Sequence, residues 1–202
     1  MEAKTLSAPR GRPREFCVED ALAAALRVFW SKGYEGASLT ELTEAMGITR
    51  PSLYAAFGNK EALFRKALDL YERDKVAYMG AALQASTARG VAERLLYGAV
   101  DLQTGDDPKG CLGVISSVAC GAEAESIRAE VVGRRASSDA ALLRRMEQAK
   151  IDGDLPAHIE PAGLVRYLSA VLQGLCLQAG TGTPVADLRD LVATTLDLWP
   201  GR

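Results

Sequence analysis

The sequence predicts an all-α protein, made of a small N-terminal three-helix head and a larger helical body. Ala, Leu, Arg and Glu are abundant, and the alternation of β-branched residues that marks strands is scarce. Apolar residues instead recur at helical spacing, between residues that typically begin or end helices. The chain has 202 residues, of which 48% are hydrophobic, and this is enough to build a buried core.

The first fifteen residues predict a flexible basic arm. They are polar and contain Pro and Gly, and Ala3–Arg14 contains Arg10, Arg12 and Arg14 but no acidic residue. The formal net charge of the whole chain is -2, so positive charge is concentrated locally in this arm.

The first predicted helix is Val18–Lys32. Leu22, Leu26 and Phe29 fall on one face of it and predict a buried stripe. Gly33 follows directly, where a left-handed cap favours glycine. This helix is therefore expected to pack one apolar face against the rest of the head.

Two short helices follow, each with its own capping signal. Ser38 and Glu41 have the spacing of a capping box at the start of the second helix, and Gly47 ends it. Thr49 is the expected N-cap of a third helix at Arg50–Phe57, in which a proline in the first turn is tolerated.

The body is expected to continue the helical pattern. Asn59 caps a fourth helix that begins at Lys60 and continues to about Gln84. Further helices are expected at about Gly90–Gln103, Cys111–Ala119, Ala124–Lys150, Pro161–Gln178 and Pro184–Trp199.

The helices on either side of Gly47 have the form of a compact reader of the DNA major groove. The N-terminus of such a second helix meets base edges, and here it presents Arg50, Pro51 and Ser52. The guanidinium of Arg50 can bind a guanine through two hydrogen bonds, a contact worth roughly 1–3 kcal/mol of discrimination. The expected DNA contacts are Arg10, Arg12, Arg14, Thr40, Thr49, Arg50, Pro51, Ser52, Tyr54, Ala55 and Lys60.

Simpler interpretations exist for some residues of the head. Leu53 and Phe57 lie four residues apart and are interpreted as core. Tyr54 can be half core, and Lys60 alone would be a solvated surface lysine. The order of arm, capped helices and Lys60 together favours nucleic-acid binding.

Two segments carry a resemblance to a known family. GYEGASL at Gly33–Leu39 and LYAAFGNKEAL at Leu53–Leu63 resemble the N-terminal domain of TetR/AcrR transcriptional regulators. Many relatives have an aromatic residue or His at one or both of the positions of Ala55 and Ala56, so phosphate contacts there are expected to be weaker. An alanine can still contact a thymine methyl group.

The resemblance implies a homodimer that regulates transcription, usually by repression that a small molecule relieves. It divides the chain into the arm (1–15), a helix-turn-helix DNA-binding domain (16–62) and a ligand-binding and dimerisation domain (63–202). The operator would be a palindromic duplex, and the effector an apolar or aromatic molecule. The candidate effector contacts are Tyr78, Met79, Leu96, Tyr97, Leu112, Ile115, Met146 and Leu172. The candidate dimer contacts are Leu164, Leu168, Val171, Leu175, Leu188, Leu191, Val192 and Thr195. Each of these residues has a plainer interpretation as ordinary core.

The four cysteines raise an alternative. Cys17 lies at a helix N-terminus near Arg14, which should lower the pKa of its thiol, so thiol-based redox sensing through Cys17 is the alternative function. Cys111 and Cys120 would point to opposite sides of one continuous helix, and His158 is the single histidine, so no metal site is expected.

Other classes of protein are not expected. The sequence contains no P-loop, dinucleotide-binding, zinc-protease or nucleophile-elbow motif, so neither an enzyme nor a cofactor is expected. No apolar run is long enough to span a membrane, and the start of the chain lacks the apolar core of a signal peptide. Cysteines without a C-x-x-C pair favour a reduced, cytoplasmic setting.

Overall fold

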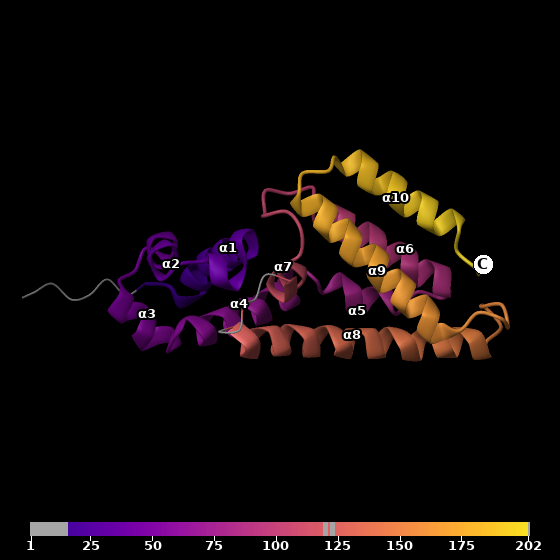
Figure 1. Cartoon of the computed structure of the whole chain (residues 1–202), viewed down its shortest axis with the longest axis horizontal. Coiled ribbons are helices and arrows are strands. Elements are labelled where there is room, and N and C mark those ends of the chain that lie inside the picture. The colour runs from indigo at the N-terminus through magenta and orange to yellow at the C-terminus, as the bar shows by residue number, and fades with distance from the viewer. Residues whose placement is uncertain (1–15, 119–120, 122–123, 202) are drawn as a thin grey trace, which may run out of the picture.

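The computed structural model describes residues 16–118, 121 and 124–201, and every regular element among them is a helix (Figure 1). The predicted arm, with Arg10, Arg12 and Arg14, lies outside the described residues. The fold class is the one that the sequence predicted.

The head consists of α1 (Val18–Gly36), α2 (Leu39–Met46) and α3 (Arg50–Phe57). Its core is built from fully buried side chains such as Phe29 and Leu53. The head lies at one end of an elongated molecule, and the body forms the other end (Figure 1).

The predicted caps of the head are present. The Ser38 hydroxyl accepts the backbone N–H of Glu41 at 3.2 Å, and the Glu41 carboxylate accepts the backbone N–H of Ser38 at 3.0 Å. Gly47 ends α2 in the left-handed conformation, and Thr49 caps α3. At Gly33 φ is +71° but ψ is 178°, so the helix breaks there and makes a further turn to Gly36.

The fourth helix is shorter than predicted. α4 (Lys60–Asp74) ends well before Gln84, and a separate short helix, α5 (Tyr78–Ala82), follows. The break lets Tyr78 lie on Gly98, where any added Cβ atom would be 2.3 Å from the tyrosine ring. A continuous helix has the same local sequence pattern, so the sequence pattern alone does not show the break.

The remaining helices of the body have bounds within a few residues of the prediction. They are α6 (Ala88–Asp101), α7 (Leu112–Val118), α8 (Glu125–Ile151), α9 (Pro161–Gly180) and α10 (Val185–Asp197). α8 runs along one side of the molecule from beside α4 to the far end (Figure 1).

Two hydrophobic clusters divide the interior. The head cluster also contains Leu112 of α7 and Ile127 and Val131 of α8. The body cluster is built around α6, α9 and α10. The cluster that contains the head core therefore extends through α4 and α7 to the first part of α8.

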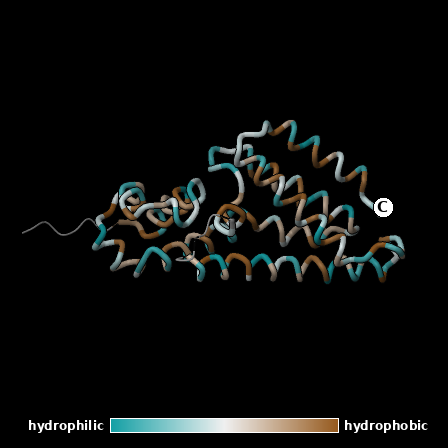
Figure 2. Tube along the Cα trace, viewed as in Figure 1, coloured by the Kyte–Doolittle hydropathy of each residue, from teal (hydrophilic) through white to brown (hydrophobic). Residues whose placement is uncertain are grey.

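Hydrophilic and apolar residues alternate around the helices, as the hydropathy colours show (Figure 2). No helix in the described ranges has the length and apolar character needed to cross a bilayer.

Candidate functional site

The N-terminus of α3 forms an exposed polar face together with the start of α2. Arg50 is exposed, and its Nη2 donates a hydrogen bond to Thr40 Oγ1 at 2.8 Å. The Thr49 and Ser52 hydroxyls are 2.9 Å apart, and the Ser52 backbone N–H donates to Thr49 Oγ1 at 3.3 Å. The Arg50 guanidinium at the start of α3 is therefore held by the Thr40 hydroxyl of α2.

The next residues of α3 divide between surface and core. Pro51 and Ala55 are exposed, and Tyr54 retains 47% of its surface. Leu53 and Phe57 are buried, as their spacing predicted. Tyr54 therefore belongs to the exposed face and not to the core.

Lys60, at the start of α4, is more enclosed than a free surface lysine. Its Nζ lies 4.6 Å from the centroid of the Tyr34 ring, a cation–π arrangement. Burial lowers the pKa of Lys60, and the nearby charge of Glu35 opposes this. A phosphate contact would require Lys60 to leave the ring or to reach past it.

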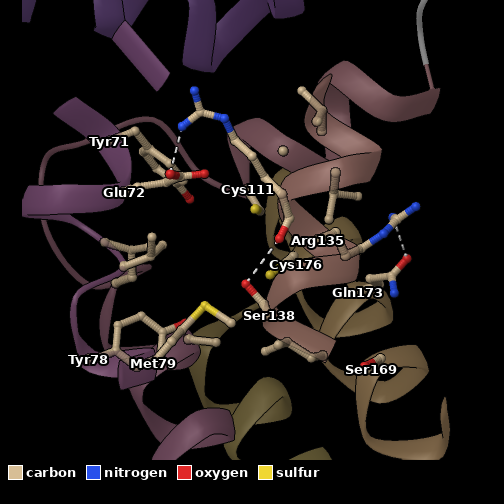
Figure 3. A pocket seen from close by; sticks show the side chains of 18 of the residues that line it. Tyr71, Glu72, Tyr78, Met79, Cys111, Arg135, Ser138, Ser169, Gln173 and Cys176 are labelled. Carbon is tan, nitrogen blue, oxygen red and sulfur yellow. Dashed lines mark hydrogen bonds and ion pairs between the residues drawn. The ribbon is translucent and has the colours of Figure 1, made fainter. Parts of the chain in front are cut away.

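A cavity of about 500 Å³ lies in the body (Figure 3). Its walls come from α4 to α9 and combine apolar side chains with a polar edge. The apolar lining includes Leu68, Val76, Tyr78, Met79, Val131 and Leu172. The polar lining includes Glu72, Gln103, Arg134, Arg135, Ser138, Asp139, Ser169 and Gln173.

Three of the eight predicted effector contacts line this cavity: Tyr78, Met79 and Leu172. Leu96, Leu112 and Met146 do not, because they are fully buried in the two hydrophobic clusters.

Ile115 and Tyr97 also lie elsewhere. The Ile115 side chain reaches Gly33, where an added Cβ atom would be 3.2 Å from Ile115 Cγ2. The Tyr97 ring packs beneath Arg189 of α10 at 5.8 Å. An apolar stripe on a helix does not tell which of its members faces a cavity.

Sequence reasoning missed the polar edge of the cavity. Arg135 Nη1 donates to the Gln173 side chain at 3.1 Å, and Ser169 Oγ donates to Asp139 at 2.7 Å. These residues come from α8 and α9, and a possible signal was polar residues that interrupt the apolar pattern of these helices.

One arginine of the cavity wall also ties α8 to α4. Arg134 Nη1 lies 2.7 Å from both Glu72 and Asp69 of α4, and its Nη2 lies 2.7 Å from Glu130. Glu130 in turn pairs with Arg65 of α4 at 2.5 Å. The cavity wall is therefore connected by charge pairs to the helix that follows the head.

Most of the predicted dimer contacts are already buried within the single chain. Leu164, Leu168, Leu175, Leu188, Val192 and Thr195 belong to the interior, and Val171 and Leu191 are half-buried against it. The predicted stripe is thus the inner face of α9 and α10, because these helices pack on α6 and each other. A different stripe on α9, called the exposed stripe below, consists of the exposed residues Tyr167, Ala170 and Leu177 and the partly exposed Gly174.

Cys17 is exposed and makes no capping hydrogen bond at the start of α1. It does not line the cavity. Cys111 and Cys176 do, and each of the two thiols shifts the pKa of the other. Sequence spacing gave no indication of this pair, since Cys111 lies just before α7 and Cys176 lies on α9.

Comparison with known proteins gives consistent results. Residues 21–67 match the family model described as bacterial regulatory proteins, tetR family. The HTH-type transcriptional repressor ComR of Escherichia coli strain K12 is 33% identical over 95% of this chain and 92% of that protein. The repressor BdcR of the same organism is 46% identical over 71 residues, which are 35% of this chain and 36% of that protein.

A solved structure of the TetR family regulator CifR covers 94% of this chain and 100% of that chain, with 41% identity and a TM-score of 0.87. That structure is a cysteine mutant in complex with a 26-base-pair double-strand operator DNA. Because ComR and CifR match across nearly their whole lengths, this chain belongs to the TetR family of transcriptional regulators.

Proposed function

We propose that this protein is a homodimeric repressor that binds a palindromic operator and is released from it by a small molecule bound in the body. The observation that carries the proposal is the exposed face at the N-terminus of α3, where Arg50 lies beside Thr40. The complex of CifR with operator DNA supports it, since the head of that relative aligns with this one.

In this proposal Arg50 and Ser52 contact bases in the major groove, and Thr40, Thr49, Pro51, Tyr54, Ala55 and Lys60 lie along the adjoining backbone or groove wall. Arg10, Arg12 and Arg14 hold the backbone or the minor groove. Exchanging the Thr40 contact for a guanine costs Arg50 one hydrogen bond and gains two. Two heads related by a two-fold axis then read half-sites about 34–36 Å apart, or a multiple of this distance.

For the dimer we propose the exposed stripe on α9 as the central contact. Tyr167 and Leu177 retain 42% and 59% of their surface, and Ala170 and Gly174 lie between them at helical spacing. A Cβ atom added at Gly174 would meet no atom within 4 Å. Small residues between two large apolar ones allow a second helix to approach closely.

For the effector we propose an apolar or aromatic molecule with a hydrogen-bonding group. Tyr78, Met79 and Leu172 would contact its apolar part, and the Arg135–Gln173 pair its polar group. A ligand that displaces Glu72 or Arg134 loosens the connection between α8 and α4 and shifts the population of head positions. Operator release requires that the ligand bind the released form more tightly.

The test of DNA reading begins with selection of an operator from a random duplex library. Arg50→Ala should weaken binding by about 1–3 kcal/mol, which is roughly 5-fold to 150-fold. Arg144→Ala, an exposed arginine of α8, is the matched control and should bind like the parent. Affinity should also fall steeply with salt, because phosphate contacts release counterions. Equal losses in the two variants, or a flat salt dependence, would overturn the assignment.

The dimer and the effector are tested separately. Gly174→Glu should give a monomer in sedimentation, whereas Gly163→Glu, at an equally open position nearer the start of α9, should stay dimeric. A dimeric Gly174→Glu protein would reject the proposed contact through α9.

The effector is tested with compounds that raise the thermal stability of the protein and weaken operator binding. Such compounds should lose both effects in Leu172→Trp, because the larger side chain fills the cavity.

A further inference from the structure

Two free thiols meet in the wall of the cavity. Cys111 lies just before α7 and Cys176 lies on α9, and both side chains line the cavity, where Figure 3 labels them. Cys111 is partly exposed, whereas Cys176 is buried. We propose that Cys111 and Cys176 form a redox pair, which a hydroperoxide that enters the cavity oxidises to a disulfide, and that this weakens operator binding. The second part rests on the proposed DNA-binding function.

The surroundings of the pair distinguish the two sulfurs. The side chains of Cys176 and Tyr71 and the backbone N–H groups of Val114 and Gly113 interact with the Cys111 thiol, and they lower its pKa despite its burial. The interaction with Cys111, followed by burial, raises the pKa of the Cys176 thiol. Cys111 is therefore the attacking thiolate and Cys176 the resolving thiol.

The buried position of Tyr71 supports this assignment. Its side chain is only 2% exposed, and its hydroxyl has no close hydrogen-bond partner among the described residues. The hydroxyl faces the Cys111 side chain and interacts with it. A buried donor in this position gains a full partner when Cys111 is a thiolate.

The reaction balances with a hydroperoxide as the oxidant. The Cys111 thiolate attacks the O–O bond, which breaks, giving a sulfenic acid and an alkoxide that takes up a proton to become an alcohol. The Cys176 sulfur then attacks the Cys111 sulfur, the S–O bond breaks, and the hydroxide leaves with the Cys176 proton as water. Two thiols and one hydroperoxide thus yield one disulfide, one alcohol and one water.

The pair is better suited to this reaction than to a metal ion. Within residues 16–118, 121 and 124–201, no third histidine, cysteine or carboxylate joins the two thiols as a cluster. Tyr71 and the backbone N–H groups are donors, and they stabilise a thiolate rather than a cation. The apolar part of the cavity admits a hydroperoxide with an organic substituent.

A short route connects the pair to the head. Gly110 precedes Cys111, and its carbonyl accepts the indole N–H of Trp30 of α1 at 3.1 Å. With φ at +86°, Gly110 also lies against α9, where an added Cβ atom would be 3.2 Å from the Cys176 carbonyl. The Trp30 ring packs edge-on against Tyr71, with centroids 4.7 Å apart. A bond between the two sulfurs acts directly on the residues that hold α1.

The test uses the full-length protein with its selected operator. Reduced protein is treated with hydrogen peroxide or with cumene hydroperoxide, and peptides are mapped by mass spectrometry without reductant. We expect a Cys111–Cys176 disulfide and at least 10-fold weaker operator binding, both reversed by dithiothreitol. Cumene hydroperoxide should act at lower concentration, because the cavity lining is largely apolar.

Variants separate the pair from the other thiols. Reduced Cys176→Ser should bind the operator as the parent does. After treatment with hydroperoxide it should form no Cys111–Cys176 disulfide, and it should not show the loss of operator binding that dithiothreitol reverses. Cys17→Ser and Cys120→Ser are the matched controls and should respond as the parent does.

Absence of the Cys111–Cys176 disulfide in oxidised parent protein would overturn the proposal. So would a disulfide that leaves operator affinity unchanged, or an undiminished reversible response in Cys176→Ser. The peptide map does not depend on DNA, and a reduced protein that ignores every duplex would reject the proposed function and leave the thiol chemistry as a separate result.

Discussion

The head and the body differ in how their helices begin. In the head, Ser38 and Thr49 cap α2 and α3 with side-chain hydrogen bonds to the helix starts, and Asn59 caps α4, the helix that follows the head, in the same way. In the body, α5, α8, α9 and α10 have no such bond among the described residues, whereas α6 is capped by Thr87. Local hydrogen bonds thus define the head, whereas long-range packing defines most of the body.

This difference suits the two tasks proposed for the regions. A DNA reader needs its helix starts fixed in place before it meets the duplex, and capping hydrogen bonds do this within a few residues. A cavity that responds to a ligand needs elements whose packing can shift.

The two tryptophans provide the strongest test, since one joins head and body and the other lies within the body. Trp30→Phe leaves the buried Gly110 carbonyl without its donor, which should lower the free energy of unfolding by about 1–3 kcal/mol. In Trp199→Phe the lost N–H had no partner in the described structure, so the cost should be smaller. Urea unfolding of both variants measures this, and equal losses would contradict a structural role for the Trp30 bond.

The caps of α2 and α6 allow a matched comparison. Ser38→Ala and Thr87→Ala should each lower stability by about 1 kcal/mol, because each frees an N–H at a helix start. Only Ser38→Ala should also weaken operator binding, since α2 carries Thr40. Thermal unfolding and DNA titration check the two effects, and equal DNA affinities would show that the α2 cap does not position the reader.

The charged connection between α4 and α8 should contribute less. Arg134→Gln removes three ion pairs at a partly exposed site, and about 0.2–1 kcal/mol is expected. Burial raises the pKa of Glu130, but hydrogen bonds from Arg134 and Arg65 bring it below the ordinary 4.5. The stabilisation is therefore complete above that value and is lost as the pH falls through the lowered pKa. The stability difference between parent and variant should shrink from pH 6 to pH 3, and a constant difference would refute the connection.

The smallest effect is expected at the start of α1, the uncapped helix of the head. Cys17→Asp supplies a side chain that can accept an N–H and that favours the positive helix end, so a gain of about 0.5 kcal/mol is expected. Cys17→Ala is the control and should show no gain. Thermal unfolding distinguishes them, and no difference would mean that packing already holds this end.

The sequence by itself determined the helices of the head and the family of the chain. Ser38, Gly47 and Thr49 act within a few residues of their own positions, so the bounds of α2 and α3 could be read from local spacing. The exposed position of Arg50 follows from the same local rules.

Only the tertiary structure decided where the cavity lies and which face of α9 is free. Leu164 and Leu168 have the spacing of an interface, yet the same spacing serves the interior where α9 packs on α6. Likewise Cys111 and Cys176 are 65 positions apart, and nothing local brings them together. Helical periodicity predicts that a side chain is buried, but which element packs against it depends on contacts between segments far apart in the sequence.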